Sequence, residues 1–109
     1  MSGAGAFEAI FDRGLRREGR YVQLVYVTVD GDATGRFGFV VGRKVLSRAV
    51  DRNRFKRIVR VRMRALRGAA ARYDVVIRVK RPVPRAAVDA AAAEAVSLIE
   101  RLLAPVGPA

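Results

Sequence analysis

The sequence predicts an α+β fold, an α–β sandwich with the element order α-β-β-α-β-α in which helices cover a small sheet. Three observations predict it. Hydrophobic residues make up 51% of the 109 residues, which suits one folded domain over residues 1–109 and argues against a disordered chain. Three segments have the valine-rich and aromatic composition of strands, and three others repeat apolar residues with the spacing of a helix. No internal repeat or linker divides the chain.

The first expected helix covers residues 4–13 (AGAFEAIFDR). Phe7, Ile10 and Phe11 stand at positions i, i+3 and i+4, so they share one face of this helix. Gly14 follows and would end it. For the two phenylalanines, packing into the core is the simplest interpretation of this spacing.

Three segments are expected to form strands: residues 20–30 (RYVQLVYVTVD), 36–42 (RFGFVVG) and 74–80 (DVVIRVK). Between the first two lies GDATG at 31–35, whose glycines and aspartate tolerate left-handed backbone angles. The sequence therefore predicts a hairpin that joins the first and second strands.

Residues 48–67 are expected to form a helix with two different faces. Its apolar side carries Phe55, Val59, Met63 and Leu66, with Ile58 beside them. Its basic side carries Lys56, Arg57, Arg60, Arg64 and Arg67, with Asn53 among them. Arg62 is the exception, because it projects toward the apolar side, and Gly68 is a plausible C-cap.

An alanine-rich helix is expected after RPVPR (81–85) and runs to about residue 104. Its apolar stripe consists of Val88, Ala92, Ala95, Ile99 and Leu102. Pro105 ends it, because proline cannot continue a helix.

The charge of the chain points to a polyanionic partner. There are 22 basic and 10 acidic residues, which gives a formal net charge of +12. Such an imbalance does not help folding, because like charges repel in the compact state. Nucleic acid is the first candidate and an acidic membrane surface the second. In the helix at 48–67 the basic side has no acidic partners at i+3 or i+4, which favours phosphate binding over an ordinary solvated face.

The composition also excludes several kinds of chemistry. The chain has no cysteine and no histidine, which removes disulfides, thiolate nucleophiles, imidazole metal ligands and the usual general base. Its acidic residues are scattered singly, apart from Asp30 and Asp32 in a turn, so we expect no catalytic residue and no metal site in the protein. No apolar run reaches the roughly 20 residues of a membrane span, and no signal peptide is visible. A cytoplasmic protein is therefore expected.

The run FGFVVGRKVLSRAVDRNRFKRIVR at 37–60 resembles the signature segment of the bacterial ribonuclease P protein component. The family pattern is a strand, two basic residues, and then AV-x-RN-R-x-KR-x-x-R. Arg43-Lys44, the RNR motif at 52–54, and Arg60 stand at the matching positions. The strand at 74–80 and the final helix agree as well, so the resemblance covers nearly the whole chain.

The resemblance implies an α–β sandwich whose βαβ crossover is left-handed (ribosomal protein S5 domain 2-like), an exception to the usual right-handed rule. It implies that the protein is a subunit of ribonuclease P, an endoribonuclease that removes the 5′ leader of precursor tRNA. The implied partners are ribonuclease P RNA and precursor tRNA, with no membrane and no obligate protein partner. The chemistry is expected from the RNA subunit with Mg²⁺, which is bound mainly by that RNA and the substrate.

The resemblance also assigns two sets of site residues. The set expected to bind the RNA subunit is Arg43, Lys44, Arg48, Arg52, Asn53, Arg54, Lys56, Arg57, Arg60 and Arg64. The set expected to line a leader cleft, between the first helix and the sheet, is Phe7, Phe11, and Tyr21 or Tyr26. Aromatic side chains suit a single-stranded leader because any base can stack on them.

Two other functions fit the same residues. One is a ribosomal or other structural RNA-binding protein of the same fold with no role in processing. The other is an architectural protein that binds DNA without regard to sequence. Both would use the same basic helix, so the ability to assist cleavage of precursor tRNA is what separates them from the first hypothesis.

Overall fold

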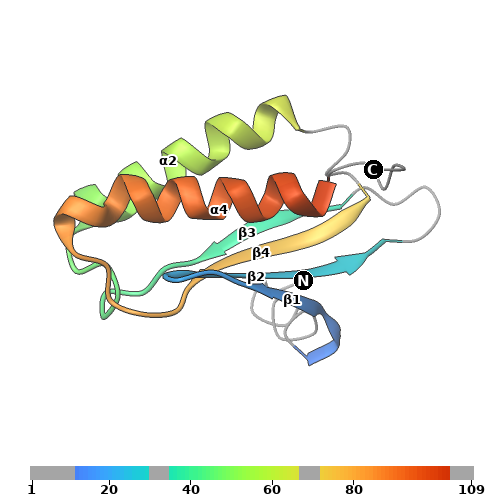
Figure 1. Ribbon diagram of the computed structural model, residues 1–109, viewed down its shortest axis with the longest axis horizontal. Helices are drawn as coiled ribbons and strands as arrows, with labels where there is room; N and C mark the ends of the chain where they lie inside the picture. Colours follow the sequence, from blue (N-terminus) through green and yellow to red (C-terminus); the bar gives the residue numbers. More distant parts are fainter. Residues whose placement is uncertain (1–11, 30–34, 67–71, 104–109) are drawn as a thin grey trace.

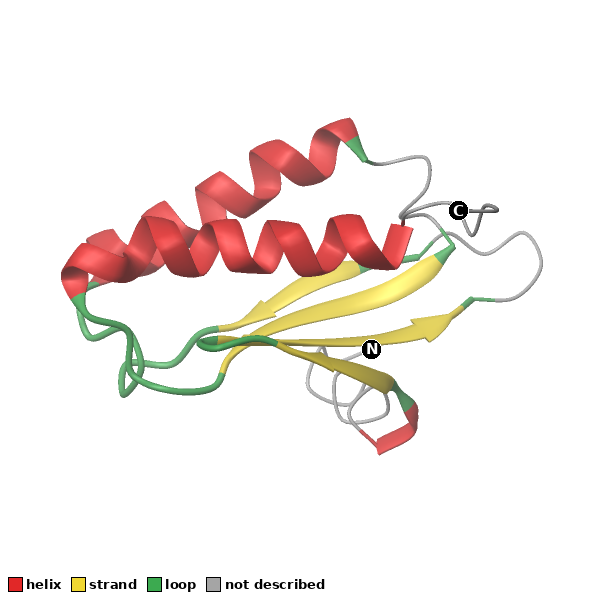
Figure 2. Cartoon of the chain, in the orientation of Figure 1, coloured by secondary structure: helices red, strands yellow, loops and turns green. Residues whose placement is uncertain are grey.

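The computed structural model describes residues 12–29, 35–66 and 72–103, in which two long helices lie on one face of a small sheet (Figures 1 and 2). The strands are β1 (Leu15–Glu18), β2 (Val22–Thr28), β3 (Phe37–Val40) and β4 (Tyr73–Val79). The helices are α2 (Ala49–Ala65), the 3₁₀ turn η1 (Arg85–Ala87) and α4 (Val88–Leu103). The predicted α+β sandwich is confirmed. Of the helix expected at 4–13, only Asp12 and Arg13 are described, and both are helical.

The four strands are arranged in the order β1-β2-β4-β3. Strand β4 pairs with β2 in antiparallel orientation and with β3 in parallel orientation, so it occupies the space between them. The predicted hairpin between the first two expected strands is therefore wrong, because β2 and β3 are not neighbours. Turn-forming residues such as those at 31–35 predict that the chain reverses direction. They do not specify which later strand pairs with β2.

The connection from β3 through α2 to β4 is the βαβ crossover that the resemblance implies. In Figure 1 both strands run toward the left, α2 returns toward the right above them, and β4 lies nearer to the viewer than β3. This path is left-handed. It places α2 over the edge of the sheet that β3 forms.

Strand β1 was missed by the sequence analysis. Its residues LRRE are all exposed, so no apolar alternation marks it. It is held by an antiparallel ladder to β2 that runs from Leu15 opposite Tyr26 to Glu18 opposite Gln23. Backbone pairing rather than side-chain burial therefore forms this strand, and a hydrophobic pattern does not detect it.

The main core lies between the sheet and the two helices. On the sheet side Leu24 and Ile77 are fully buried, and Phe55 and Val59 of α2 pack against them. Helix α4 contributes its predicted stripe, including the buried alanines Ala92 and Ala95, whose small side chains allow a close approach to β2. A second, smaller cluster on the other face of the sheet consists of Val25 and Val76, with Val27 and Val40 packed against them.

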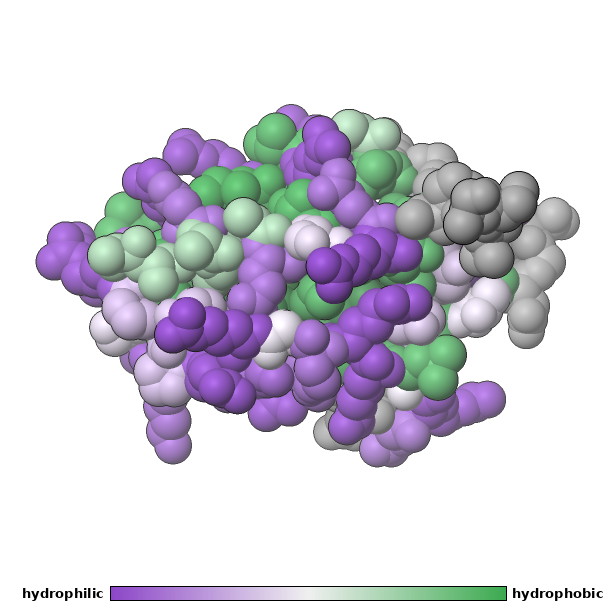
Figure 3. Space-filling view, in the orientation of Figure 1, coloured by the Kyte–Doolittle hydropathy of each residue, from purple (hydrophilic) through white to green (hydrophobic). Residues whose placement is uncertain are grey.

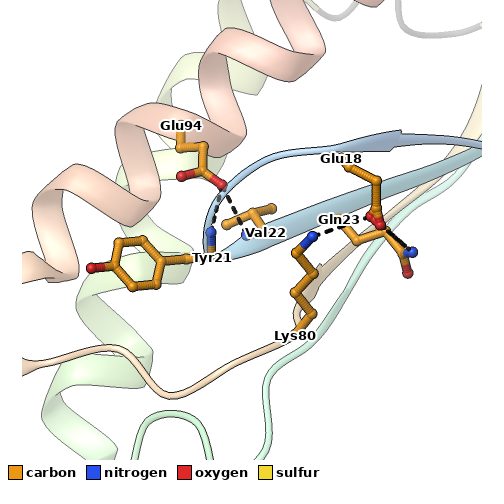
Figure 4. A network of polar contacts seen from close by, with 6 residues as sticks. All are labelled: Glu18, Tyr21, Val22, Gln23, Lys80 and Glu94. Carbon is orange, nitrogen blue, oxygen red and sulfur yellow. Dashed lines mark hydrogen bonds and ion pairs between the residues drawn. The ribbon is translucent and has the colours of Figure 1, made fainter.

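A carboxylate of α4 fixes the turn between β1 and β2. The backbone N–H groups of Tyr21 and Val22 both donate to Oε1 of Glu94, at 2.8 and 2.9 Å (Figure 4). Gly19 makes room for this contact, since a Cβ at that position would lie 2.7 Å from Cδ and 2.9 Å from Cγ of Glu94. The same turn is closed by a hydrogen bond of 2.8 Å from the Gly19 N–H to the Val22 carbonyl. Helix α4 is thereby tied to the start of β2 by polar contacts as well as by packing.

A second polar network lies on the opposite face of β2 (Figure 4). Nε2 of Gln23 donates to Oε1 of Glu18 at 2.8 Å, and Nζ of Lys80 lies 3.3 Å from Oε2 of the same carboxylate. Desolvation would raise the pKa of Glu18, but the hydrogen bonds from Gln23 and Lys80 outweigh it and keep the pKa below its ordinary value. Together with Gln23 of β2, the network links Glu18 of the edge strand β1 to Lys80, which directly follows the interior strand β4.

Candidate nucleic-acid interface

Helix α2 presents a fixed stripe of exposed polar and basic side chains. Phe55 and Val59 are fully buried and fasten one side of the helix to the sheet. The opposite side carries Asn53, Arg57, Arg60 and Arg64 at positions i, i+4, i+7 and i+11, and all four are exposed. At a rise of 1.5 Å per residue the stripe is about 16 Å long. Within the part of the chain that the structure describes, Arg57, Arg60 and Arg64 form no salt bridge, so their charge is available to a ligand.

Aromatic side chains of β3 lie directly beside this stripe. The guanidinium of Arg60 lies 5.3 Å from the centroid of the Phe39 ring. That ring in turn packs edge-on against Phe37 at 4.9 Å and against Phe55 at 6.1 Å. The contact orients Arg60 and connects the basic stripe to the edge strand. The spacing within α2 could not predict this contact, because Phe39 belongs to another element.

Three further residues of the predicted RNA-binding set precede α2. Arg43 and Lys44 are exposed in a turn in which the Gly42 carbonyl accepts from the N–H of Leu46 at 3.1 Å. Arg48 occupies the N-cap of α2 with extended backbone angles and makes no side-chain capping hydrogen bond. All three lie at the N-terminal end of α2, where the helix dipole is itself positive and a basic side chain is unfavourable. Their positions are therefore better suited to an anionic ligand than to helix stability.

Replacing Arg48 with serine tests whether this residue favours RNA binding at the expense of helix stability. A serine N-cap can accept a backbone N–H of the first turn, so Arg48→Ser is expected to raise the free energy of unfolding by about 0.5–1 kcal/mol. The same change is expected to weaken RNA binding severalfold by removing one positive charge. Thermal unfolding and filter binding would measure the two effects. Arg48→Ala is the control, because it removes the charge without adding a cap, and equal stabilisation by both variants would contradict the capping explanation.

Arg52, the first residue of the RNR motif, folds back onto its own chain. Its Nη1 donates to the backbone carbonyls of Leu46 at 2.7 Å and Ser47 at 3.0 Å. These two bonds brace the loop that leads into α2. The structure therefore places Arg52 away from the exposed stripe, whereas the sequence grouped it with the other basic residues. Lys56 is half-buried on the side of the helix that lies toward Arg60.

Two arginines of α2 form ion pairs with α4. Arg54 makes a bidentate pair with Asp89, with Nε to Oδ1 at 2.7 Å and Nη2 to Oδ2 at 2.8 Å. The hydrogen bond to Asp89 raises the pKa of Arg54 above its ordinary value. Arg62 pairs with Glu100 at 2.6 Å, which agrees with its predicted direction away from the basic side. The side chains that pair with Arg54 and Arg62, Asp89 and Glu100, both belong to α4, so the spacing within α2 could not reveal these ion pairs.

Of the residues predicted for a leader cleft, the structure describes Tyr21 and Tyr26. Phe7 and Phe11 lie outside the described residues. Tyr21 and Tyr26 lie near opposite ends of β2, and both pack against the main core. Tyr21 contacts Arg20, whose guanidinium lies 5.1 Å from its ring, and the ring of Tyr26 meets that of Tyr73 edge-on at 5.8 Å.

The described residues form neither a cluster of metal ligands nor a membrane span. In residues 12–29, 35–66 and 72–103 no three potential ligand side chains gather at a point where they could hold a metal ion. No helix within those ranges is long and apolar enough to cross a membrane. Figure 3 shows hydrophilic side chains spread across the molecular face that α4 covers, with apolar patches between them.

Comparison with known proteins gives consistent matches. A family model described as Ribonuclease P matches residues 1–103. The ribonuclease P protein component of Ralstonia pickettii is 38% identical over 88 residues, which are 80% of this chain and 61% of that protein. The corresponding protein of Acidothermus cellulolyticus is 44% identical over 101 residues, 89% of this chain and 78% of that protein.

Solved structures with similar folds include two bacterial proteins. The ribonuclease P protein of Thermotoga maritima superimposes with a TM-score of 0.71 at 22% identity, covering 98% of this chain and 99% of that one. That of Staphylococcus aureus gives a TM-score of 0.72 at 19% identity, covering 94% and 95%. At these identities the structural likeness supports the fold alone.

Proposed function

The chain belongs to the bacterial ribonuclease P protein component family, and from this we propose that it binds the catalytic RNA subunit and assists removal of the 5′ leader from precursor tRNA. The observation that carries the proposal is the stripe formed by Asn53, Arg57, Arg60 and Arg64. These side chains are exposed, the three arginines form no salt bridge among the described residues, and the buried Phe55 fixes the helix that presents them.

The stripe suits a folded RNA for a physical reason. Structured RNA is recognised mainly through its phosphates and shape, and a rigid array of guanidinium groups can meet several phosphates at fixed spacing. A disordered basic segment would first lose conformational entropy on binding, whereas α2 is ordered before the RNA arrives. The proposed contact surface is the stripe together with Arg43, Lys44, Arg48 and Lys56. It extends to Arg54, the second arginine of the RNR motif, where α2 borders α4.

The protein's part in the reaction is proposed to be electrostatic. The substrate and the catalytic RNA are both polyanions, and a chain of net charge +12 between them reduces their repulsion. Mg²⁺ is proposed to be bound mainly by the RNA subunit and the substrate, where it would stabilise charge at the reacting phosphate. The described residues offer no cluster of ligands for this ion, so no step is assigned to a metal on the protein. The cytoplasm is the proposed location.

Reconstitution tests the proposal. Adding this chain to a bacterial ribonuclease P RNA is expected to lower the Mg²⁺ concentration required for cleavage of precursor tRNA, because the protein replaces part of the charge screening that Mg²⁺ supplies. Cleavage rates across a Mg²⁺ titration, with and without the protein, would measure the effect. A second arm compares the affinity of the holoenzyme for precursor tRNA and for mature tRNA, and we expect tighter binding of the precursor.

A polylysine of similar net charge is the control for nonspecific screening. An unchanged Mg²⁺ requirement, or an equal decrease with polylysine, would refute the proposed role in processing. Tight RNA binding without any effect on cleavage would instead favour a structural RNA-binding protein of the same fold.

A further inference from the structure

The ion pair between Arg54 and Asp89 stands at a point where the proposed RNA-binding surface meets α4. Arg54 is the second arginine of the RNR motif, and Asp89 lies in the first turn of α4. Both oxygens of Asp89 are engaged, at 2.7 and 2.8 Å from Nε and Nη2 of Arg54. The pair is open to solvent, with side-chain exposures of 54% for Arg54 and 61% for Asp89.

The surroundings of the pair are polar and of mixed charge. Arg54 and Asp89 line a shallow pocket together with Asp51, Arg85, Ala86 and Val88. Asp51 lies three residues before Arg54 on the same helix and adds to the negative charge near the guanidinium. A phosphate approaching Arg54 would therefore meet a guanidinium that is already neutralised, with a carboxylate directly beside it.

We propose that Asp89 competes with RNA for Arg54, so that this acidic residue of α4 lowers the affinity of the RNR helix for its RNA. The inference rests on the proposed function, because it takes RNA phosphate as the competing ligand. A bidentate carboxylate occupies the same donors that a phosphate would use. An exposed pair of this kind is weak enough for RNA to displace, but its displacement reduces the net gain from the new contact.

A second ion pair on the same two helices provides a matched comparison. Arg62 and Glu100 also join α2 to α4, at 2.6 Å, and their side-chain exposures of 54% and 42% are similar. Arg62, however, lies outside the RNR motif and on the side of α2 away from the exposed stripe. Neutralising Glu100 removes the same amount of charge and a similar helix–helix contact, but it should not release a phosphate-binding group.

A double-mutant cycle tests the competition. Binding of ribonuclease P RNA is measured for wild type, Asp89→Asn, Arg54→Ala and the double variant at several salt concentrations. Asp89→Asn is expected to bind about three- to fivefold more tightly than wild type at low salt. In the Arg54→Ala background the same change is expected to alter affinity by less than about 1.5-fold, because Asp89 acts through Arg54. Glu100→Gln is expected to stay within about 1.5-fold of wild type.

Three results would overturn the inference while leaving the proposed function intact: unchanged or weaker binding by Asp89→Asn, equal tightening in the Arg54→Ala background, or equal tightening by Glu100→Gln. The last two would mean that only overall charge matters. Asp89→Ser provides a second neutral variant if Asp89→Asn proves unstable by circular dichroism. A wild-type protein that does not bind the RNA at all would overturn the proposed function, and the inference with it.

Discussion

Replacing Arg57, Arg60 and Arg64 together with glutamine is expected to weaken binding to ribonuclease P RNA by about 100-fold or more near physiological salt. The three guanidiniums lie on one stripe of α2 and form no salt bridge among the described residues. Each phosphate contact that is lost should also reduce the slope of log affinity against log salt by about 0.7–0.9, so the three together reduce it by about 2 or more. Titrations at four or five salt concentrations would measure both quantities.

The matched control replaces three exposed arginines elsewhere, Arg13, Arg81 and Arg101, with glutamine. It changes the net charge by the same amount, so a generic loss of attraction would appear equally in both variants. We expect the control to lose less than about fivefold in affinity, with a slope close to that of wild type. Equal losses in the two triple variants would argue against a localised interface on α2. Circular dichroism should show that both remain folded, because all six side chains are exposed.

Glu94→Ala is expected to lower the free energy of unfolding by about 2–3 kcal/mol. The change removes one acceptor from two backbone N–H groups, those of Tyr21 and Val22, at 2.8 and 2.9 Å. Val22 is fully buried, so its N–H would be left without a partner and with little access to water. Urea denaturation would measure the loss. Glu94→Gln keeps an acceptor oxygen without the charge and should lose less than half as much.

Gly19 provides a second way to test the same contact. Because a Cβ at this position overlaps the Glu94 carboxyl, Gly19→Ala should push that side chain away and lose much of the same stability. In a Glu94→Ala background the added methyl meets no carboxyl, and Gly19→Ala should then cost less than about 0.5 kcal/mol. If the losses of unfolding free energy were instead additive in the double variant, the backbone conformation at Gly19, and not the space it leaves for Glu94, would explain the need for glycine there.

Much of the fold could be predicted because its main elements bury one face each. The bounds of α2 and β4 were predicted to within one or two residues. The buried residues Phe55 and Val59 recur with the period of a helix, and Val75 and Ile77 recur with the period of a strand. Strand β1 could not be predicted, because an exposed edge strand carries no such pattern. The position of β4 between β2 and β3 was also missed. Pairing between strands that are distant in the sequence depends on the packing of whole elements, and a local turn does not determine it.

Part of the candidate interface could likewise be predicted from the sequence, and part of it could not. The exposed stripe followed from helical spacing alone, because residues four and seven positions apart share a face whatever surrounds them. The roles of Arg52, Arg54 and Arg62 did not follow, because the partners of the last two lie 35 and 38 residues away on α4. The contact between Arg52 and the carbonyls of the preceding loop depends on backbone conformation, which composition does not show.

The strand order has a consequence for how the chain folds as it leaves the ribosome. Among the described strands, β3 has β4 as its sole partner, and β2 shares with β4 a ladder of seven residue pairs. Strand β4, however, begins only at Tyr73. While the first 72 residues emerge, the basic helix is present but the centre of the sheet beneath it is missing. The apolar side of that helix must stay exposed until synthesis reaches the second half of the chain. Nascent chains would therefore acquire the proposed phosphate-binding surface in rigid form late, when nearly the entire domain has been made.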